Sequence, residues 1–199
     1  MDDIVKAAMA KWPNVPDCHG WLGLDARGDW YMRDDGCQRS GPFALEAGEE
    51  ATRAKGSRLL HDKLIAFIGR NYLCDEQGRW LFQNGPQRVY VELELTPWVW
   101  RLQPDGSVLT HTGLPVPSVS VALLDEQGRL FLDTPLGLGL VHSNDMLLAA
   151  QALEQERWAL QELSSEALLR RSGHVRSPQR MAGMTPWLGG HETPTKKAG

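Results

Sequence analysis

The chain has 199 residues, 42% of them hydrophobic and 23% charged, which is typical of a soluble globular protein. No apolar run approaches the roughly 18 residues that a membrane span needs, and the acidic start Met1-Asp2-Asp3 lacks the order of a secretion signal. The net charge is −4 although basic residues cluster after position 170, so the rest of the chain is more acidic than the total suggests. Because an acidic protein repels phosphate backbones, nucleic acid is not an expected partner.

The first half of the chain is expected to alternate short helices with a β-hairpin. An amphipathic helix is predicted over residues 2–12 and a hairpin over 21–32. Residues 39–56 are rich in Gly, Glu and Ala without a clear period, which indicates a loop or a frayed helix. A second helix is predicted over residues 57–68, with Ser57 as its N-cap.

The second half indicates a run of strands followed by one long helix. Residues 88–95 alternate strictly between polar and apolar side chains, which predicts a half-buried antiparallel strand. Further strands are expected at residues 80–82, 98–102, 108–110, 118–123, 130–132 and 136–141. The longest helix is expected over 145–171, and Gly, Pro, Ser and Lys then indicate a mobile tail over 173–199.

One short phrase occurs three times along the chain. Asp75-Glu76-Gln77-Gly78-Arg79 is identical to Asp125-Glu126-Gln127-Gly128-Arg129, and a looser copy begins at Asp25. In such a phrase Asp can accept a hydrogen bond from the backbone two residues later, and Gly supplies the positive φ of a tight turn. Each copy is therefore predicted to be a hairpin turn, and the equal spacing indicates a duplicated supersecondary unit.

The residues that most often carry chemistry form no recognisable catalytic or metal-binding constellation. Cys18, Cys37 and Cys74 are odd in number and show no paired spacing, which favours free thiols in the cytosol. His19 follows Cys18 directly, and neighbours on an extended strand point to opposite sides, so a catalytic cysteine would need a distant histidine. No metal or phosphate-binding motif occurs. We therefore predict no catalytic residue, metal or cofactor.

The chain contains eight tryptophans, and two of them suggest a binding surface. Trp98 and Trp100 share one face of a strand because they lie two residues apart. With Arg88, Tyr90 and Arg101 they could form an aromatic and cationic patch of the kind that anchors a protein or a ligand. These five are the candidate binding residues, although core packing is the favoured role of the two tryptophans.

The order of these motifs resembles a family. The turn at 23–25 with Trp30-Tyr31 precedes a Leu-rich helix, a second Asp-x-x-Gly hairpin follows, and Pro97 and a Leu-Asp-Thr-Pro motif precede the last helix. Over about residues 18–148 the chain resembles a bacterial family of unknown function that is built from repeated helix-plus-hairpin motifs. The resemblance implies involvement in signalling or regulation and no catalytic residues.

The expected fold is α+β, with a curved antiparallel sheet of repeated β-hairpins covered by two main helices, 57–68 and 145–171. Residues 1–16 form an N-terminal helix and linker. The body spans 17–172, which could divide near residue 112, and a flexible basic tail completes the chain.

The expected function is that of a non-catalytic, cytosolic interaction or regulatory module that binds a protein or a small molecule, with neither nucleic acid nor membrane as partner. One alternative is a cysteine-dependent hydrolase or transferase. Another is a structural subunit, such as a homo-oligomer, that docks through its long C-terminal helix.

Overall fold

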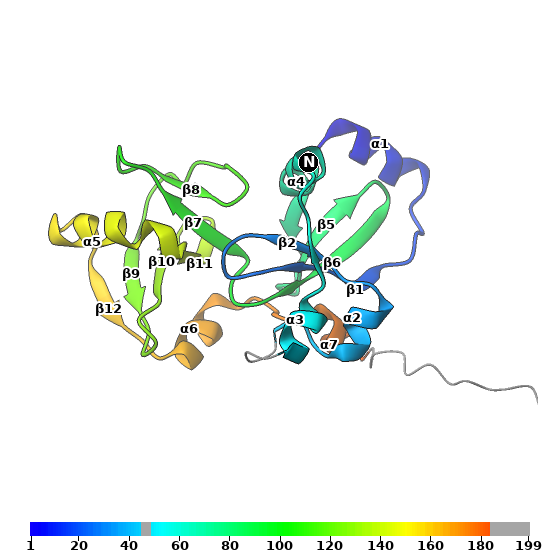
Figure 1. Ribbon diagram of the computed structural model, residues 1–199. Helices are drawn as coiled ribbons and strands as arrows, with labels where there is room; N and C mark the ends of the chain where they lie inside the picture. Colours follow the sequence, from blue (N-terminus) through cyan, green and yellow to red (C-terminus); the bar gives the residue numbers. More distant parts are fainter. Residues whose placement is uncertain (45–48, 184–199) are drawn as a thin grey trace, which may run out of the picture.

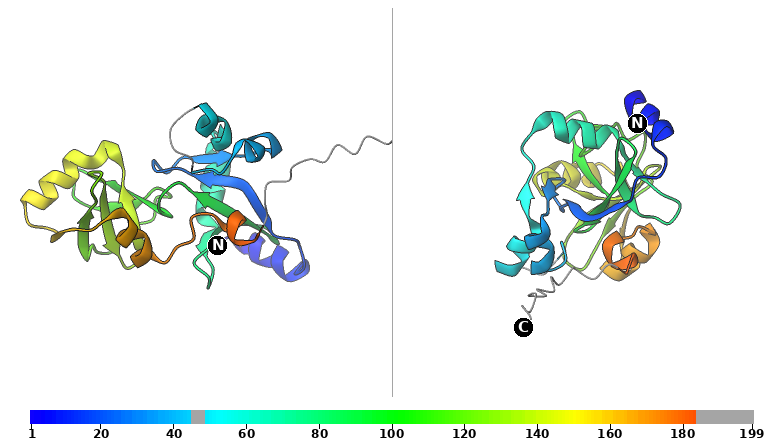
Figure 2. Two further views of the ribbon diagram at one scale, coloured as in Figure 1. Left: turned by 90° about the horizontal axis from the view of Figure 1, so that it is seen from below. Right: turned by 90° about the vertical axis from the view of Figure 1, so that its right-hand side faces the viewer.

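The computed structural model describes residues 1–44 and 49–183, which form two lobes that lie side by side (Figure 1). Each lobe is built on a six-stranded sheet. The chain passes from the first sheet to the second through residues 94–97 and returns to the first lobe through residues 173–177 (Figure 2). The division that the sequence suggested near residue 112 would separate two strands of the second lobe from the rest of their sheet.

The first lobe contains the N-terminal half of the chain. Its sheet has the strand order β3-β2-β1-β6-β5-β4. These strands are β1 (Cys18–Leu24), β2 (Trp30–Met32), β3 (Ser57–Arg58), β4 (Tyr72–Cys74), β5 (Trp80–Asn84) and β6 (Gln87–Leu93). Its helices are α1 (Asp3–Lys11), α2 (Asp35–Ser40), α3 (Glu49–Lys55), α4 (Asp62–Arg70) and the C-terminal α7 (Pro178–Met181).

The second lobe has the strand order β12-β9-β10-β11-β7-β8. These strands are β7 (Trp98–Leu102), β8 (Val108–Thr110), β9 (Val121–Leu124), β10 (Leu130–Thr134), β11 (Gly137–Val141) and β12 (Leu160–Glu162). Its helices are the 3-10 turn η1 (Ser143–Asp145), α5 (Met146–Glu154) and α6 (Ser165–Ser172).

Both sheets combine antiparallel and parallel pairing. In the first sheet the antiparallel meander β4-β5-β6 joins the hairpin β1-β2 because β6 runs parallel to β1. In the second sheet the meander β9-β10-β11 joins the hairpin β7-β8 because β11 runs parallel to β7. The α+β class is therefore confirmed, whereas a single antiparallel sheet is wrong. Turn residues show which consecutive strands pair as hairpins. Parallel strands that pair are far apart in the sequence, so no local signal reveals their pairing.

The three phrases form the predicted turns. Asp25 Oδ1 accepts hydrogen bonds from the backbone N–H groups of Arg27 and Asp29, at 2.8 and 2.9 Å. The Asp75 and Asp125 carboxylates accept the equivalent pairs of bonds. Each glycine has a positive φ, between 74° and 81°. The first two turns lie in one sheet and the third in the other, so the equal spacing does not mark three copies of one larger unit.

Two helices differ from the expected ranges. The predicted helix 57–68 begins at Asp62, where the His61 side chain accepts a bond from the backbone of Leu64, because Ser57 instead belongs to strand β3. The predicted helix 145–171 is three separate elements, α5, β12 and α6. It is interrupted where Glu156 adopts a φ of +53°, a left-handed conformation that ends a helix. Between residues 145 and 183 the structure therefore holds no single long helix for docking a partner.

The start of the expected mobile tail is packed. The backbone N–H of Val175 donates to Gly78 O at 2.8 Å, and that of Leu93 donates to Arg176 O at 2.8 Å. Residues 173–177 thus lie along the first lobe, where α7 packs on β1 and β6. The rest of the expected tail, residues 184–199, lies outside the described residues.

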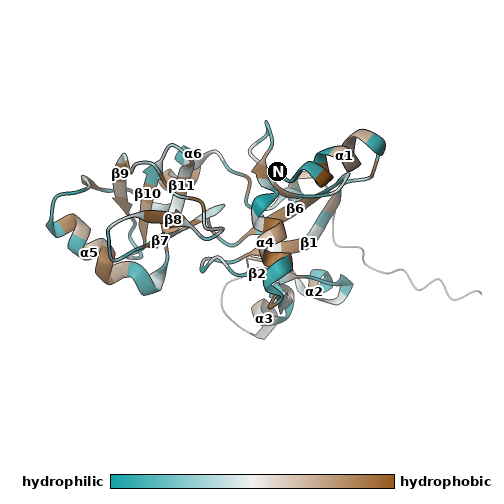
Figure 3. Ribbon diagram, turned by 90° about the horizontal axis from the view of Figure 1, so that it is seen from above, coloured by the Kyte–Doolittle hydropathy of each residue, from teal (hydrophilic) through white to brown (hydrophobic). Residues whose placement is uncertain are grey.

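The main apolar core continues from one lobe into the other. The hydrophobic residues are concentrated on strands such as β7, β9 and β10 (Figure 3). Between the sheets, Trp98 contacts Tyr72 and Trp80, with ring centroids 5.5 and 4.9 Å apart. The Tyr72 hydroxyl donates to Pro97 O at 3.1 Å. Trp80 and Trp98 therefore pack against each other where the two lobes meet. Over the described ranges no helix has the length and apolarity needed to cross a membrane.

Candidate functional site

The five candidate binding residues do not form a surface patch. Trp98 and Trp100 are 6% and 0% exposed, and their indole N–H groups donate to backbone carbonyls in the core. Tyr90 is also buried, under Arg79. Strand β7 lies between β11 and β8 and is covered on both faces, so both tryptophans pack internally. The favoured core role of the tryptophans is thus confirmed.

The two candidate arginines lie on different sheets. Arg88 is exposed on β6 in the first sheet. Arg101 lies on β7 in the second sheet, and its Nε is 2.7 Å from Asp145 Oδ2. The two arginines therefore do not form one cationic patch, although Arg88 lies within reach of the Tyr90 side chain on the same strand.

A pocket of about 430 Å³ lies beside the two segments that connect the lobes. Its walls come from residues 94–96 between β6 and β7, from the β9–β10 turn, from β10 and β11, from α6 and from residues 174–176. Pockets for small organic molecules usually measure about 300–1,000 Å³, so this one has the size of a small ligand.

The pocket has an apolar floor. Phe131, Leu138 and Leu168 line it, and all three are buried in a second hydrophobic cluster that is separate from the main core. Leu95 packs against the same cluster, and Leu169 of α6 lines the pocket beside it. A ligand in this pocket would therefore meet aliphatic and aromatic side chains on one side.

Arg129 lines the pocket as one member of an ion pair. Its Nε donates to Asp125 Oδ2 at 2.7 Å, and its Nη2 donates to Ser165 Oγ at 3.1 Å. The Asp125 side chain is fully buried in the turn between β9 and β10. The guanidinium charge is therefore balanced within the protein.

Arg176 is the second arginine on the wall, and its charge is not balanced in this way. One Nη donates to the backbone carbonyl of Glu94, whereas its buried Nε has no hydrogen-bond partner in the described structure. None of the ion pairs between described residues includes it. Burial, and then the nearby charge of Arg129, lower the pKa of Arg176, whereas the charge of Glu94 acts to raise it. Such a half-buried, unpaired cation is unusual.

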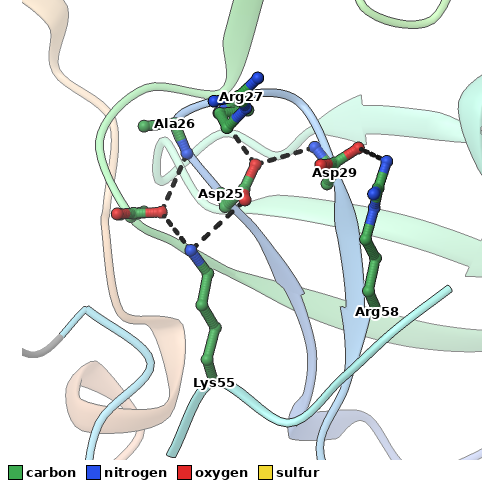
Figure 4. A network of polar contacts seen from close by, with 7 residues as sticks. Asp25, Ala26, Arg27, Asp29, Lys55 and Arg58 are labelled. Carbon is green, nitrogen blue, oxygen red and sulfur yellow. Dashed lines mark hydrogen bonds and ion pairs between the residues drawn. The ribbon is translucent and has the colours of Figure 1, made fainter. Parts of the chain in front are cut away.

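Glu94, which also lines the pocket, forms an ion pair with Lys55, the residue that Figure 4 shows beside Asp25. Its Oε2 lies 2.9 Å from Lys55 Nζ and also accepts the backbone N–H of Ala26 at 3.0 Å. Lys55 Nζ is 3.3 Å from Asp25 Oδ2 as well. Burial alone would lower the pKa of Lys55, but its bond to Glu94 and the charges of both carboxylates raise it. The Glu94 carboxylate is thus committed to Lys55.

His174 adds a neutral group to the wall. Its Nε2 lies 2.7 Å from Leu95 O, and because a carbonyl can only accept, Nε2 carries the proton. The other ring nitrogen, Nδ1, is buried and without a partner in the described structure. Burial lowers the pKa of His174, and Arg176 acts in the same direction, so the ring is neutral at pH 7.

The cysteines do not have the environment of catalytic nucleophiles. All three are free, and burial is the largest cause of a raised thiol pKa at Cys18, Cys37 and Cys74. An activated cysteine needs the opposite, a lowered pKa. Within the described ranges, no group of three or more His, Cys, Asp or Glu side chains could hold a metal ion.

Sequence reasoning missed the residues of this pocket. Arg176 fell in the segment expected to be a mobile tail, and Arg129 was attributed to the turn scaffold. The repeated phrase that ends at Arg129 did mark this residue in the sequence. Arg176 comes close to it only because the chain returns to the first lobe after α6, which no local pattern predicts.

The fold and the pocket define an α+β protein of two sheets with a ligand-sized cavity at the connection between its lobes. The chain belongs to the family DUF2944, described as "Protein of unknown function (DUF2946)", whose model matches residues 1–184. The expected membership of an uncharacterised family is thereby confirmed.

One solved structure similar to this chain is the crystal structure of a DUF1285 family protein from Silicibacter pomeroyi DSS-3. The two chains share 12% sequence identity with a TM-score of 0.44, and the match covers 72% of this chain and 74% of that chain. A comparison with curated proteins gives no match.

Proposed function

We propose that the protein is a non-catalytic regulatory module that binds a small organic anion in the pocket between its lobes. The observation that carries the proposal is Arg176, a half-buried guanidinium on the pocket wall without a carboxylate partner in the described structure. A bound anion would place a negative charge beside the Arg176 guanidinium and would accept hydrogen bonds from its N–H groups. Hydrogen bonds to charged groups contribute about 1.5–3 kcal/mol each.

The position of the pocket supports a regulatory role. Its wall includes both segments that connect the lobes, residues 94–96 and 174–176. A ligand there would stabilise the arrangement of lobes to which it binds, because binding to one conformation shifts the population towards it. A partner protein could then recognise the liganded arrangement. Cytosolic residence is part of this proposal, since a reducing compartment keeps the three thiols free.

The test is calorimetric titration of a panel of organic anions into the protein and into R176Q. We expect at least one anion to bind, and the variant to bind it at least tenfold more weakly, which corresponds to about 1.4 kcal/mol. R180Q is the matched control because Arg180 is exposed four residues further on and does not line this pocket. Absence of binding by the whole panel, or equal affinities of R176Q and the parent, would contradict the proposal.

A further inference from the structure

We infer that the anion is a monocarboxylate with an apolar tail, whose carboxylate pairs with Arg176 and whose tail lies on Phe131, Leu138 and Leu168. This inference rests on the proposed function and narrows it to one chemical class, of which fatty acids are the simplest members.

The charges around the pocket favour a single negative charge on the ligand. Arg129 is paired with Asp125, whereas Lys55 is shared between the carboxylates of Glu94 and Asp25, so this second group keeps an excess negative charge beside the pocket. Arg176 forms no ion pair with a described residue, although the Glu94 charge acts on it, and its buried Nε has no hydrogen-bond partner in the described structure. A dianion such as a phosphate monoester would carry a second negative charge close to the Glu94 carboxylate, which also lines the pocket.

His174 does not supply a second cation. Its ring donates to Leu95 O through Nε2, and its neutral state at pH 7 leaves Nδ1 as a hydrogen-bond acceptor. An acceptor cannot bond a further anionic oxygen. The polar end of the pocket therefore suits one planar carboxylate, which matches the fork of a guanidinium group.

The floor of the pocket favours an apolar tail. Phe131, Leu138 and Leu168 offer no hydrogen-bonding side-chain atoms, so a polar ligand body would lose its hydration there without compensation. An alkyl tail instead gains about 0.8 kcal/mol for each buried CH₂, which corresponds to about fourfold in affinity. The volume of about 430 Å³ lies in the lower part of the usual range, so the tail is of moderate length.

The experiment measures dissociation constants of butyrate, hexanoate, octanoate and decanoate, with octanol and octyl phosphate as comparisons. The affinity is expected to rise about fourfold per CH₂ until the pocket is full. Octanol and octyl phosphate are each expected to bind at least tenfold more weakly than octanoate. R176Q should lose at least tenfold of the octanoate affinity and little of the octanol affinity, whereas R180Q should resemble the parent.

Two further variants keep the test decisive. R176K retains the charge but not the planar fork, so an octanoate affinity between those of the parent and R176Q is expected, and it replaces R176Q if that variant fails to fold. L169Q places a polar group on the half-buried pocket wall. It should weaken octanoate severalfold and leave butyrate nearly unchanged.

The outcomes separate this inference from the proposed function. Octyl phosphate binding as tightly as octanoate, in an Arg176-dependent manner, would overturn the carboxylate class and leave anion binding intact. Equal affinities for butyrate and octanoate would overturn the apolar tail. If neither these anions nor the wider panel bind, the inference and the proposed function both fail.

Discussion

At the scale of single residues, the aspartate that opens each repeated turn does more than close a hairpin. Asp125 accepts the backbone N–H groups of Gln127 and Arg129, and it also holds the guanidinium of Arg129 at the pocket. A fully buried carboxylate with several donors is costly to remove, because each donor is left without its partner.

The substitution D125A should therefore destabilise the protein by about 3 kcal/mol. D105A is the matched control, since Asp105 bonds Ser107 in an exposed turn and should cost less than about 1 kcal/mol. Urea unfolding monitored by tryptophan fluorescence measures both. Equal losses in the two variants would show that the buried ion pair contributes nothing special.

The enclosed His111 ring makes stability depend on pH. Its ring lies among Trp30, Tyr72 and Trp98, and burial lowers the pKa of His111 from 6.5 to about 3. Because the folded-state pKa lies below the unfolded one, stability is fully present above pH 6.5 and is lost as the pH falls towards about 3.

Between pH 6.5 and 4.5 this histidine should cost about 2.3 kcal/mol of unfolding free energy. H111F keeps the aromatic packing and removes the titration, so its stability should fall less steeply over this range. The slope should not vanish, since the pKa values of His19, His142 and His174 are lowered too. Parallel stability curves for H111F and the parent, from urea unfolding at several pH values, would contradict the assignment.

At the scale of elements, the turns could be predicted from the sequence, whereas the pairing of distant strands could not. The three Asp-x-x-Gly turns form as expected because their hydrogen bonds lie within five residues. Strand 98–102 was also predicted correctly. Its burial on both faces was left open, because that depends on the parallel partner β11, some forty residues away.

The break in the expected helix 145–171 shows the same limit. Glu and Gln favour a helix, so nothing in the residues 154–157 announces a stop, yet Glu156 takes a φ of +53°. The strand after it, β12, pairs with β9, and this tertiary contact overrides helix propensity. Arg176 was missed for a related reason, since its bonds to the first lobe join residues far apart in sequence.

Replacing Glu156 tests this account of the helix end. E156G should stabilise the protein by about 0.5–1 kcal/mol, because glycine adopts a left-handed conformation without steric strain. E154G is the matched control, since Glu154 is an exposed residue at the end of α5, where glycine should destabilise by up to about 1 kcal/mol. Thermal unfolding gives both signs, and a loss of stability in E156G would contradict the account.

At the scale of the whole molecule, the return of the chain after α6 joins the two lobes a second time. Ser177 Oγ donates to Glu92 Oε2 at 2.6 Å, and the backbone N–H of Gln179 donates to Glu92 Oε1 at 3.0 Å. Burial raises the pKa of Glu92, whereas these two bonds act to lower it. The buried carboxylate is thus the anchor of the returning segment.

The substitution S177A should loosen this anchor, because the buried Glu92 carboxylate loses a donor. We expect a loss of about 1–3 kcal/mol in the local opening free energy. Hydrogen exchange of the Val175 and Gln179 amides measures it, and both should exchange at least fivefold faster. S172A is the control, since Ser172 bonds only within α6 and its own helix end. Unchanged exchange in S177A would mean that other contacts hold the segment.

The pocket between the lobes is the centre of this functional account, and locating a bound ligand tests it most directly. Crystals of the protein grown with octanoate that is brominated at its terminal carbon would reveal the bromine by anomalous scattering. We predict the bromine against Phe131, Leu138 or Leu168, with the carboxylate within hydrogen-bond distance of the Arg176 guanidinium. A bromine peak elsewhere on the molecule, or an empty pocket at saturating ligand, would contradict the account.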